Sequence, residues 1–166
     1  HKRKMMMNYQ KILYHSKVGN LTVVSDNHYI RKISFGKGDL HPGAEWCDNH
    51  PLLVQAELQL TEYFNGMRRY FTLPIAVDGT PFQKAVWNAL LEISYGETVT
   101  YGDLAKKIDK PNASRAVGGG CNKNPIVIVI PCHRVIGVNG NLTGFAGGIT
   151  VKENLLALER KFQTNG

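Results

Sequence analysis

The chain has 166 residues, 43% of them hydrophobic, which is enough to bury the core of one domain or of two small ones. Its 20 lysines and arginines outnumber 13 aspartates and glutamates, for a formal net charge of +7. This charge favours a polyanionic partner such as nucleic acid, although many basic proteins bind nothing anionic. The apolar runs fall well short of the roughly 20 residues that cross a bilayer, so no membrane-spanning helix is expected.

The cysteines and histidines indicate neither a disulfide framework nor a metal site. Cys47, Cys121 and Cys132 are an odd number at irregular spacing, which favours a reducing, cytoplasmic compartment. No CxxC or HExxH pair is present, and His41 and His50 lie near Cys47 only as loose candidates in a loop. We therefore expect no metal and no cofactor.

The first half of the chain predicts a small sheet followed by one helix. Three β-rich runs, separated by turn-forming residues, lie at 12–15, 21–25 and 29–35. Pro51 then opens an amphipathic helix that Gly66 should end. Residues 74–79 are typical of a linker, so residues 8–74 are predicted to form an N-terminal α+β domain with an antiparallel sheet.

The second half, residues 80–162, predicts mainly helices. Residues 80–83 form a capping box with proline at the first helical position, and the helix that they open should run to about residue 95. Thr100 can cap a second, short helix, and Asn112 can cap a third over residues 113–121. Two short helices joined by a brief turn are the outline of a helix-turn-helix.

The predicted helix at 113–121 reads ASRAVGGGC, an unusual composition for a helix. Each interior glycine costs roughly 1 kcal/mol relative to alanine, so close approach to another backbone should compensate. Arg115 is the single long side chain on an otherwise smooth surface. Alone it would be an ordinary surface arginine, but on this helix in a basic chain it is better interpreted as a probe inserted into a nucleic-acid groove.

Residues 124–135, NPIVIVIPCHRV, are the most distinctive segment. The five apolar residues 126–130 predict a strand buried on both faces, which the following proline ends because it lacks an N–H. Cys132 is thus a candidate nucleophile at the end of a rigid segment, and His133 and Arg134 supply positive character that favours the thiolate. Without further context, a Cys-His pair is more often structural.

His133 needs both a route to the thiol and an orienting partner. Neighbouring side chains of an extended segment point to opposite faces, so His133 should reach Cys132 only through a water or after a turn. Glu159, expected on the polar side of the last helix, is a suitable acceptor for one ring nitrogen.

Asn139-Gly140 is a strong hairpin signal that joins residues 134–138 to residues 141–145 in a predicted β wing. A capping box at residues 150–153 then opens the last helix. The predicted fold class is therefore α+β, with a small antiparallel sheet and helix followed by a mainly α, winged helix-turn-helix-like domain that carries the active-site cysteine.

Four motifs now give the chain a family resemblance. In chain order they are YGETVTY at 95–101, RAVGG at 115–119, NP at 124–125 and PCHRV at 131–135. Together they strongly resemble the O6-methylguanine-DNA methyltransferases, from about residue 80 to residue 159. The first half resembles the variable, RNase H-like N-terminal domain of that family only in outline. The resemblance implies direct-reversal DNA repair, in which an alkyl group passes irreversibly from O6-alkylguanine in duplex DNA to a cysteine, once per molecule.

The resemblance also implies a role for each catalytic residue. Cys132 would accept the alkyl group, His133 would draw the thiol proton through a water, and Glu159 would hold His133. Tyr101 would hydrogen-bond the flipped guanine, and Asn124 would brace the site.

A helix in the minor groove would flip the damaged base, and Arg115 would fill its place. The other residues expected to contact DNA are Ala113, Ser114, Ala116, Gly118 and Tyr101. The residues expected around the base pocket are Val135, Phe145 and Ala146. Phe145 stands where many relatives have tyrosine, which leaves the range of accepted alkyl groups open.

The implied protein is a cytoplasmic monomer of prokaryotic type, associated with the nucleoid when on DNA, without metal, cofactor or membrane contact. Its phosphate contacts should give salt-dependent affinity without sequence preference. Two alternatives remain. A non-catalytic module of the alkyltransferase-like type would have tryptophan in place of Cys132, and a Cys-His hydrolase with repeated turnover would not need helices that read DNA.

Overall fold

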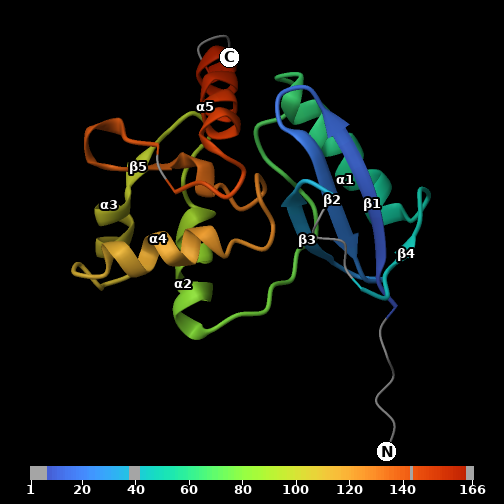
Figure 1. Ribbon diagram of the computed structural model, residues 1–166, viewed down its shortest axis with the longest axis horizontal. Coiled ribbons are helices and arrows are strands. Elements are labelled where there is room, and N and C mark those ends of the chain that lie inside the picture. Colours follow the sequence, from blue (N-terminus) through green and yellow to red (C-terminus); the bar gives the residue numbers. More distant parts are fainter. Residues whose placement is uncertain (1–6, 38–41, 143, 164–166) are drawn as a thin grey trace, which may run out of the picture. The chain divides into compact units, whose positions relative to one another are not determined.

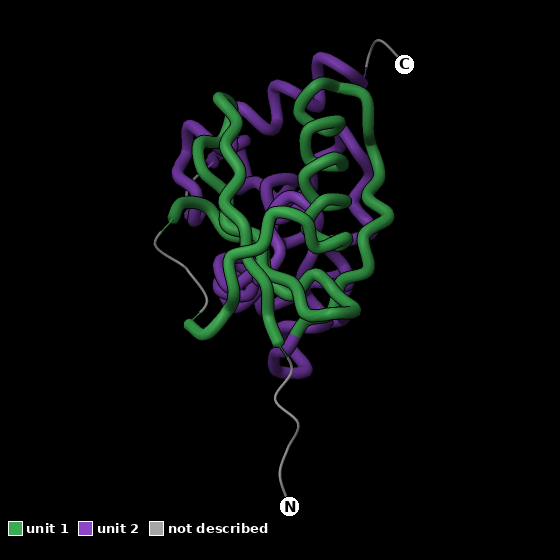
Figure 2. The backbone as a smooth tube through the Cα atoms, turned by 90° about the vertical axis from the view of Figure 1, so that its right-hand side faces the viewer, with its two compact units in different colours: residues 1–77 green, residues 78–166 purple. Residues whose placement is uncertain are grey.

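The structure is a computed structural model that describes residues 7–37, 42–142 and 144–163. The chain divides into two compact units, residues 1–77 and residues 78–166 (Figure 2). No helix in these described ranges is long and apolar enough to cross a membrane.

The described part of unit 1 is a four-stranded sheet with one helix (Figure 1). Its strands are β1 (Tyr9–His15), β2 (Gly19–Ser25), β3 (Ile30–Phe35) and β4 (Glu45–Trp46). The predicted antiparallel meander of β1, β2 and β3 is confirmed. β4 pairs in parallel with β1, which gives the order β3-β2-β1-β4. A two-residue strand in a turn-rich loop has no periodicity, so no sequence pattern predicts β4.

The helix of unit 1, α1 (Pro51–Phe64), begins at the predicted proline, and Gly66 follows its end with a φ of 76°. The predicted linker at 74–79 is wrong at its start. Ile30 N donates to Pro74 O at 2.8 Å, and Ala76 N donates to Ile30 O at 3.1 Å, so these residues continue the edge of unit 1 beside β3.

Unit 2 contains α2 (Pro81–Leu90), β5 (Val99–Thr100), α3 (Tyr101–Lys107), α4 (Ser114–Asn122) and α5 (Ile149–Gln163). The capping boxes expected at the starts of α2 and α3 are both present. Three predicted boundaries are wrong. α2 ends at Leu90 rather than near residue 95, and the N-cap of α4 is Ala113, without a side-chain hydrogen bond, rather than Asn112. α5 begins at Ile149, so Thr150 lies inside the helix and is not the cap of the box predicted at residues 150–153.

The turn between α3 and α4 is a Schellman motif. Asp109 N donates to Lys106 O at 3.0 Å, and Lys110 N donates to Ala105 O at 2.9 Å. Asp109 occupies the left-handed position, with a φ of 61°, where glycine is the usual residue. This closure gives the two helices the short connection that a helix-turn-helix requires.

The apolar segment 126–130 is buried as predicted, but it is not a strand. Ile130 N donates back to Ile126 O at 2.9 Å, and Val129 N donates to Val127 O at 2.9 Å. Ile128 has a φ of 74°, which is rare for a β-branched residue. The segment folds back on itself as a compact turn, because its backbone groups pair with one another instead of with a neighbouring strand.

The predicted β wing is also wrong. Asn139 and Gly140 do have the left-handed φ values of 72° and 77° that a tight turn needs. However, the only strand that follows Arg134 among the described residues is β6 (Val135–Ile136), which pairs in parallel with β5. Gly137 N donates to Asn141 O at 2.7 Å to close the turn. Thr143, in the second predicted arm, lies outside the described residues.

Candidate active site and nucleic-acid interface

Cys132 lies at a sharp reversal of the backbone in unit 2. Its N–H donates to Ile130 O at 2.8 Å, which closes a three-residue turn around Pro131. Residues 132–134 then form one 3-10 turn, in which Arg134 N donates to Pro131 O at 3.0 Å. Because this segment is a turn, Cys132 and His133 do not alternate as they would on a strand. Cys132 is 6% exposed.

Asn124 holds the two ends of the compact turn together. Its side-chain oxygen accepts from Ile126 N at 2.9 Å, and its side-chain nitrogen donates to Ile130 O at 2.7 Å. The same side chain hydrogen-bonds Cys132. A residue two positions after the end of α4 thus fixes the backbone that carries the thiol. Asn124 is therefore placed where a brace between helix and cysteine is needed.

Glu159 on α5 binds two neighbouring side chains of the 3-10 turn. His133 Nε2 lies 2.7 Å from its Oε2, while Arg134 donates from Nε to Oε1 at 2.8 Å and from Nη2 to Oε2 at 3.0 Å. The contact expected between His133 and Glu159 is present, but Glu159 is fully buried rather than on a polar, solvated face. The backbone N–H of Gly96 also donates to Glu159, at 3.1 Å.

The charges of this cluster determine which nitrogen of His133 can take a proton. Burial alone would raise the pKa of Glu159, but the hydrogen bonds from His133 and Arg134, together with the charge of Arg134, outweigh burial and hold that pKa well below its usual range. An ionised Glu159 can only accept, so Nε2 of His133 carries the hydrogen. Burial lowers the pKa of His133, which keeps the ring neutral and leaves Nδ1 as the basic atom. Nδ1 is buried and has no hydrogen-bond partner among the described residues.

Arg134 does not act on the thiol as the sequence suggested. Two of its nitrogens bind Glu159, and Nη1 donates to Ile93 O at 2.7 Å. Its guanidinium also lies over the Tyr95 ring, 5.7 Å from the ring centroid. Because Glu159 neutralises its charge, Arg134 instead fastens α5 to the turn that carries Cys132.

The cation beside the thiol is Lys152, which sequence reasoning missed. Lys152 is 1% exposed. Its Nζ lies 5.9 Å from the ring centroid of Tyr101 and 5.6 Å from that of Phe145. Burial raises the pKa of Cys132, whereas the hydrogen bond from Asn124 and the charge of Lys152 lower it. A usable signal exists in the sequence, because Lys152 and Glu159 are seven residues apart and so share one side of a helix.

Tyr101 lies close to both buried thiols of unit 2. It is half-buried at the start of α3, and burial together with the nearby Cys121 and Cys132 raises the pKa of its hydroxyl. Phe145 is half-buried and contacts the same lysine as Tyr101. Of the other predicted pocket residues, Val135 is completely buried in β6 and Ala146 is exposed.

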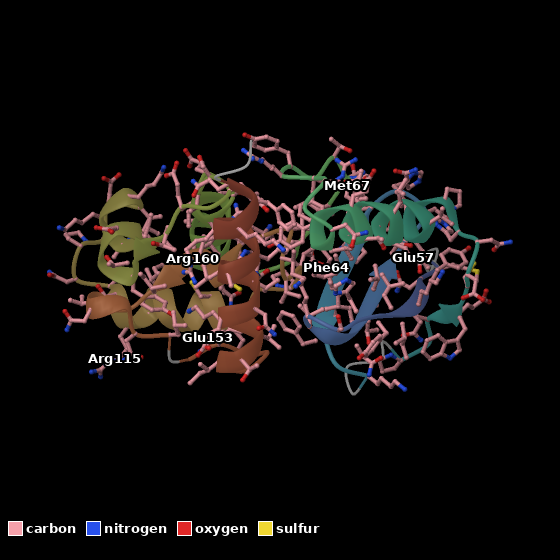
Figure 3. All side chains as sticks on the ribbon, turned by 90° about the horizontal axis from the view of Figure 1, so that it is seen from above. Glu57, Phe64, Met67, Arg115, Glu153 and Arg160 are labelled. Atoms are coloured by element: carbon pink, nitrogen blue, oxygen red, sulfur yellow. The ribbon has the colours of Figure 1, made fainter. Side chains whose placement is uncertain are left out.

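The exposed side of α4 is nearly bare. Arg115, Ala116 and Gly119 are exposed, while Ala113, Ser114 and Gly118 are half-buried. Figure 3 shows the Arg115 side chain projecting outward from its unit. A Cβ added at Gly119 would meet nothing within 4 Å, and one at Gly118 would lie 3.8 Å from the Tyr101 ring.

Only one glycine of this helix is explained by close packing. A Cβ at Gly120 would lie 3.3 Å from Val86 of α2, and Trp87 Nε1 donates to Gly120 O at 3.0 Å. The close approach is therefore to the side chain of Val86 rather than to another backbone. Gly119 has no such contact in the described chain, so packing does not account for it.

The described residues contain no group of three or more His, Cys, Asp or Glu side chains that could hold a metal ion. His41, one of the loose zinc candidates, lies outside them. Cys47, Cys121 and Cys132 are all free.

The fold and the site define a class of protein, an α+β chain whose second unit joins a helix-turn-helix to a buried cysteine. Residues 81–161 match the 6-O-methylguanine DNA methyltransferase DNA-binding domain, and residues 10–77 match the ribonuclease-like domain of the same proteins. The chain therefore belongs to the 6-O-methylguanine DNA methyltransferase family.

Individual relatives cover nearly the whole chain. The methylated-DNA–protein-cysteine methyltransferase of Methanosarcina acetivorans is 47% identical over 149 residues, 89% of this chain and 96% of the relative. The protein of the same name from Haemophilus influenzae is 46% identical, over 89% of this chain and 84% of the relative. The crystal structure of Mycobacterium tuberculosis OGT in complex with DNA is similar, with a TM-score of 0.87 and 38% identity over 93% of this chain and 94% of that one. The resemblance seen in the motifs is confirmed and extends to unit 1.

Proposed function

We propose that this protein repairs alkylated DNA by direct reversal, moving the alkyl group of O6-alkylguanine to Cys132 in a single, irreversible turnover. Family membership supports the activity. The observation that carries the assignment to Cys132 is its place on the closed turn, next to the buried pair of His133 and Glu159. Displacement at an alkyl carbon needs an aligned, soft thiolate and no metal.

The proton of Cys132 leaves first, and Nδ1 of His133 is the atom that receives it, through a water. Glu159 holds the ring and stabilises the positive charge that forms on it. The sulfur then bonds to the alkyl carbon while the bond from that carbon to O6 breaks, and its electron pair stays on the guanine. Tyr101 donates a hydrogen bond to the leaving base. In the net reaction, guanine gains the proton that the thiol has lost. Because a thioether is a poor leaving group, the protein reacts once.

The bare face of α4 supports a role in opening the duplex. O6 of a stacked guanine faces the major groove, out of reach of a buried thiol behind a helix in the minor groove, so the damaged base must leave the stack before reaction. A helix surface of alanine and glycine can approach the floor of the minor groove closely, and Arg115 can occupy the vacated space. Ala113, Ser114, Ala116 and Gly118 would lie against the DNA beside it.

We also propose that the protein acts as a monomer in the cytoplasm. An acceptor thiol requires a reducing compartment, and the three free cysteines agree with one. Size-exclusion chromatography and cell fractionation test the two parts of this proposal; a stable dimer, or a protein found only outside the cytoplasm, would contradict them.

The acceptor is tested by mass spectrometry after reaction with a duplex that contains O6-methylguanine. We expect one methyl group per protein, on the peptide that contains Cys132, and no further turnover. Cys132→Ser should gain no methyl group but still bind the duplex. Methylation of Cys121 or Cys47, or more than one product per protein, would refute the assignment.

The role of α4 is tested with Arg115→Ala. The variant should react much more slowly with methylated duplex but nearly normally with free O6-methylguanine base, because only the duplex needs base extrusion. Lys84→Ala, which removes an exposed charge from α2, is the matched control and should change both reactions little. Equal losses on duplex and free base would show that Arg115 does not act in extrusion.

A further inference from the structure

Lys152 is a buried cation without a carboxylate partner. It is the fourth residue of α5, is 1% exposed, and forms no ion pair with an acidic side chain of the described chain. Burying an ammonium group without an anion is costly. Contact with two aromatic rings offsets only part of that cost. Packing alone therefore does not explain a lysine at this position.

The groups that face Lys152 come from four elements. They are Tyr101 of α3, Cys121 of α4, Cys132 and His133 of the 3-10 turn, and Phe145 of the loop before α5. None of these is a permanent anion. A negative charge next to the ammonium can come only from a thiolate or from the tyrosine hydroxyl.

Cys132 is the one of these groups best prepared to carry that charge. Burial raises the pKa of Cys121 to about 12, so this thiol stays protonated near neutral pH. Burial likewise raises the pKa of Tyr101. Cys132 alone among the three also accepts a hydrogen bond from Asn124, which favours its anion.

We propose that Lys152 is the electrostatic partner of the Cys132 thiolate, held over the rings of Tyr101 and Phe145 so that its charge offsets the burial of the sulfur. Lys152 is then a positioning residue for the transfer reaction, and the proposal rests on the function proposed above. His133 removes the proton from Cys132, and Lys152 stabilises the anion that remains. The positive charge is needed until the sulfur–carbon bond forms, since the thioether is neutral.

The test measures the pH dependence of Cys132 alkylation by iodoacetamide, followed on the Cys132 peptide so that Cys47 and Cys121 do not contribute. Lys152→Met keeps the length and apolar stem of the side chain and removes the charge. Its midpoint should lie about one pH unit or more above that of the unaltered protein, because a nearby opposite charge shifts a pKa by roughly 1–3 units. Near pH 7 its transfer rate from methylated duplex should fall about tenfold.

Two further variants separate charge from structure. Lys161→Met removes an exposed charge from the same helix and should leave the midpoint unchanged. Lys152→Arg keeps the charge and should keep the midpoint within about half a pH unit of the unaltered protein. Thermal unfolding of Lys152→Met should occur at the same temperature or higher, since replacing a buried charge by an apolar group is often neutral or stabilising.

An unchanged midpoint in Lys152→Met would overturn the proposal. Equal shifts in Lys152→Arg and Lys152→Met, or a fall in thermal stability that parallels the loss of reactivity, would also overturn it. The proposed function has an independent readout, the methyl group gained by the unaltered protein. If that methyl group is missing while the iodoacetamide midpoints still differ, the proposed function fails, but the electrostatic pairing of Lys152 with the Cys132 thiolate stands.

Discussion

At the scale of residues, the site depends most on Glu159. It accepts from His133, Arg134 and the backbone of Gly96 while completely buried. A buried charge that loses its partner is costly, whereas an exposed pair contributes little. The protein thus places two basic side chains around one acid, and only His133 keeps a nitrogen free for chemistry.

Glu159→Gln should therefore reduce both stability and rate. Arg134 would keep its charge in a buried place, and the free energy of unfolding should fall by about 3 kcal/mol. The single-turnover rate should fall by about 100-fold, because His133 loses the anion that stabilises its protonated ring. Urea unfolding and single-turnover kinetics measure the two effects.

The matched control is Glu92→Gln. Glu92 pairs with Lys107 at 3.3 Å, with side chains 62% and 49% exposed, and its loss should change stability by less than ~1 kcal/mol. If the two variants lose similar stability, the buried cluster is not the anchor described above.

At the scale of elements, helix α4 contains two glycines that are there for different reasons. Gly120 has little room for a side chain, because an added Cβ would lie 3.3 Å from the completely buried Val86. Gly119 has open space around it. A glycine that the fold does not require, on the face that also carries Arg115, is consistent with close approach of an external surface.

Gly119→Ala should stabilise the protein by about 0.5–1 kcal/mol, because alanine favours the helix and meets no neighbour. Gly120→Ala should be less stable than Gly119→Ala by at least ~1 kcal/mol, since its methyl group would overpack against Val86. Denaturant unfolding of the two variants provides the comparison.

Gly119→Leu places a larger side chain on the same face of α4. This variant should react more slowly with methylated duplex and at an unchanged rate with the free base. Equal effects on both substrates would indicate that this face does not meet DNA.

For the whole molecule, stability should fall as the solution is acidified from pH 7.5 to 5.5. Burial lowers the pKa of His133 below its ordinary value of 6.5, so just below pH 6.5 the unfolded chain binds a proton that the folded chain does not. The free energy of unfolding therefore decreases with falling pH, at up to about 1.4 kcal/mol per pH unit. Glu159 acts in the same direction at lower pH, since its lowered pKa contributes stability that is lost below about 4.5.

Urea unfolding at several pH values measures this dependence. In His133→Gln the slope between pH 6.5 and pH 5.5 should be much smaller, because glutamine does not titrate. A slope unchanged by the substitution would assign the pH dependence to other groups.

Local sequence determined much of this protein. The caps at Thr80 and Thr100, the proline that opens α1 and the turn at Asn139-Gly140 are all present, because each depends on residues within a few positions of one another. The order of the family motifs by itself indicates a methyltransferase. The pairing of His133 with Glu159 was also expected, from one helical face and the need to orient the ring.

Only the tertiary structure decided what the apolar segment 126–130 becomes. Its composition suits a strand, but a strand needs a partner, and Asn124 instead closes the segment into a turn. The same holds for charge. Arg134 is adjacent to Cys132 in sequence yet is neutralised by Glu159, whereas Lys152, twenty residues away, lies beside the thiol. Electrostatic partners are set by distance in space and by burial, and neither can be read from neighbouring positions in the chain.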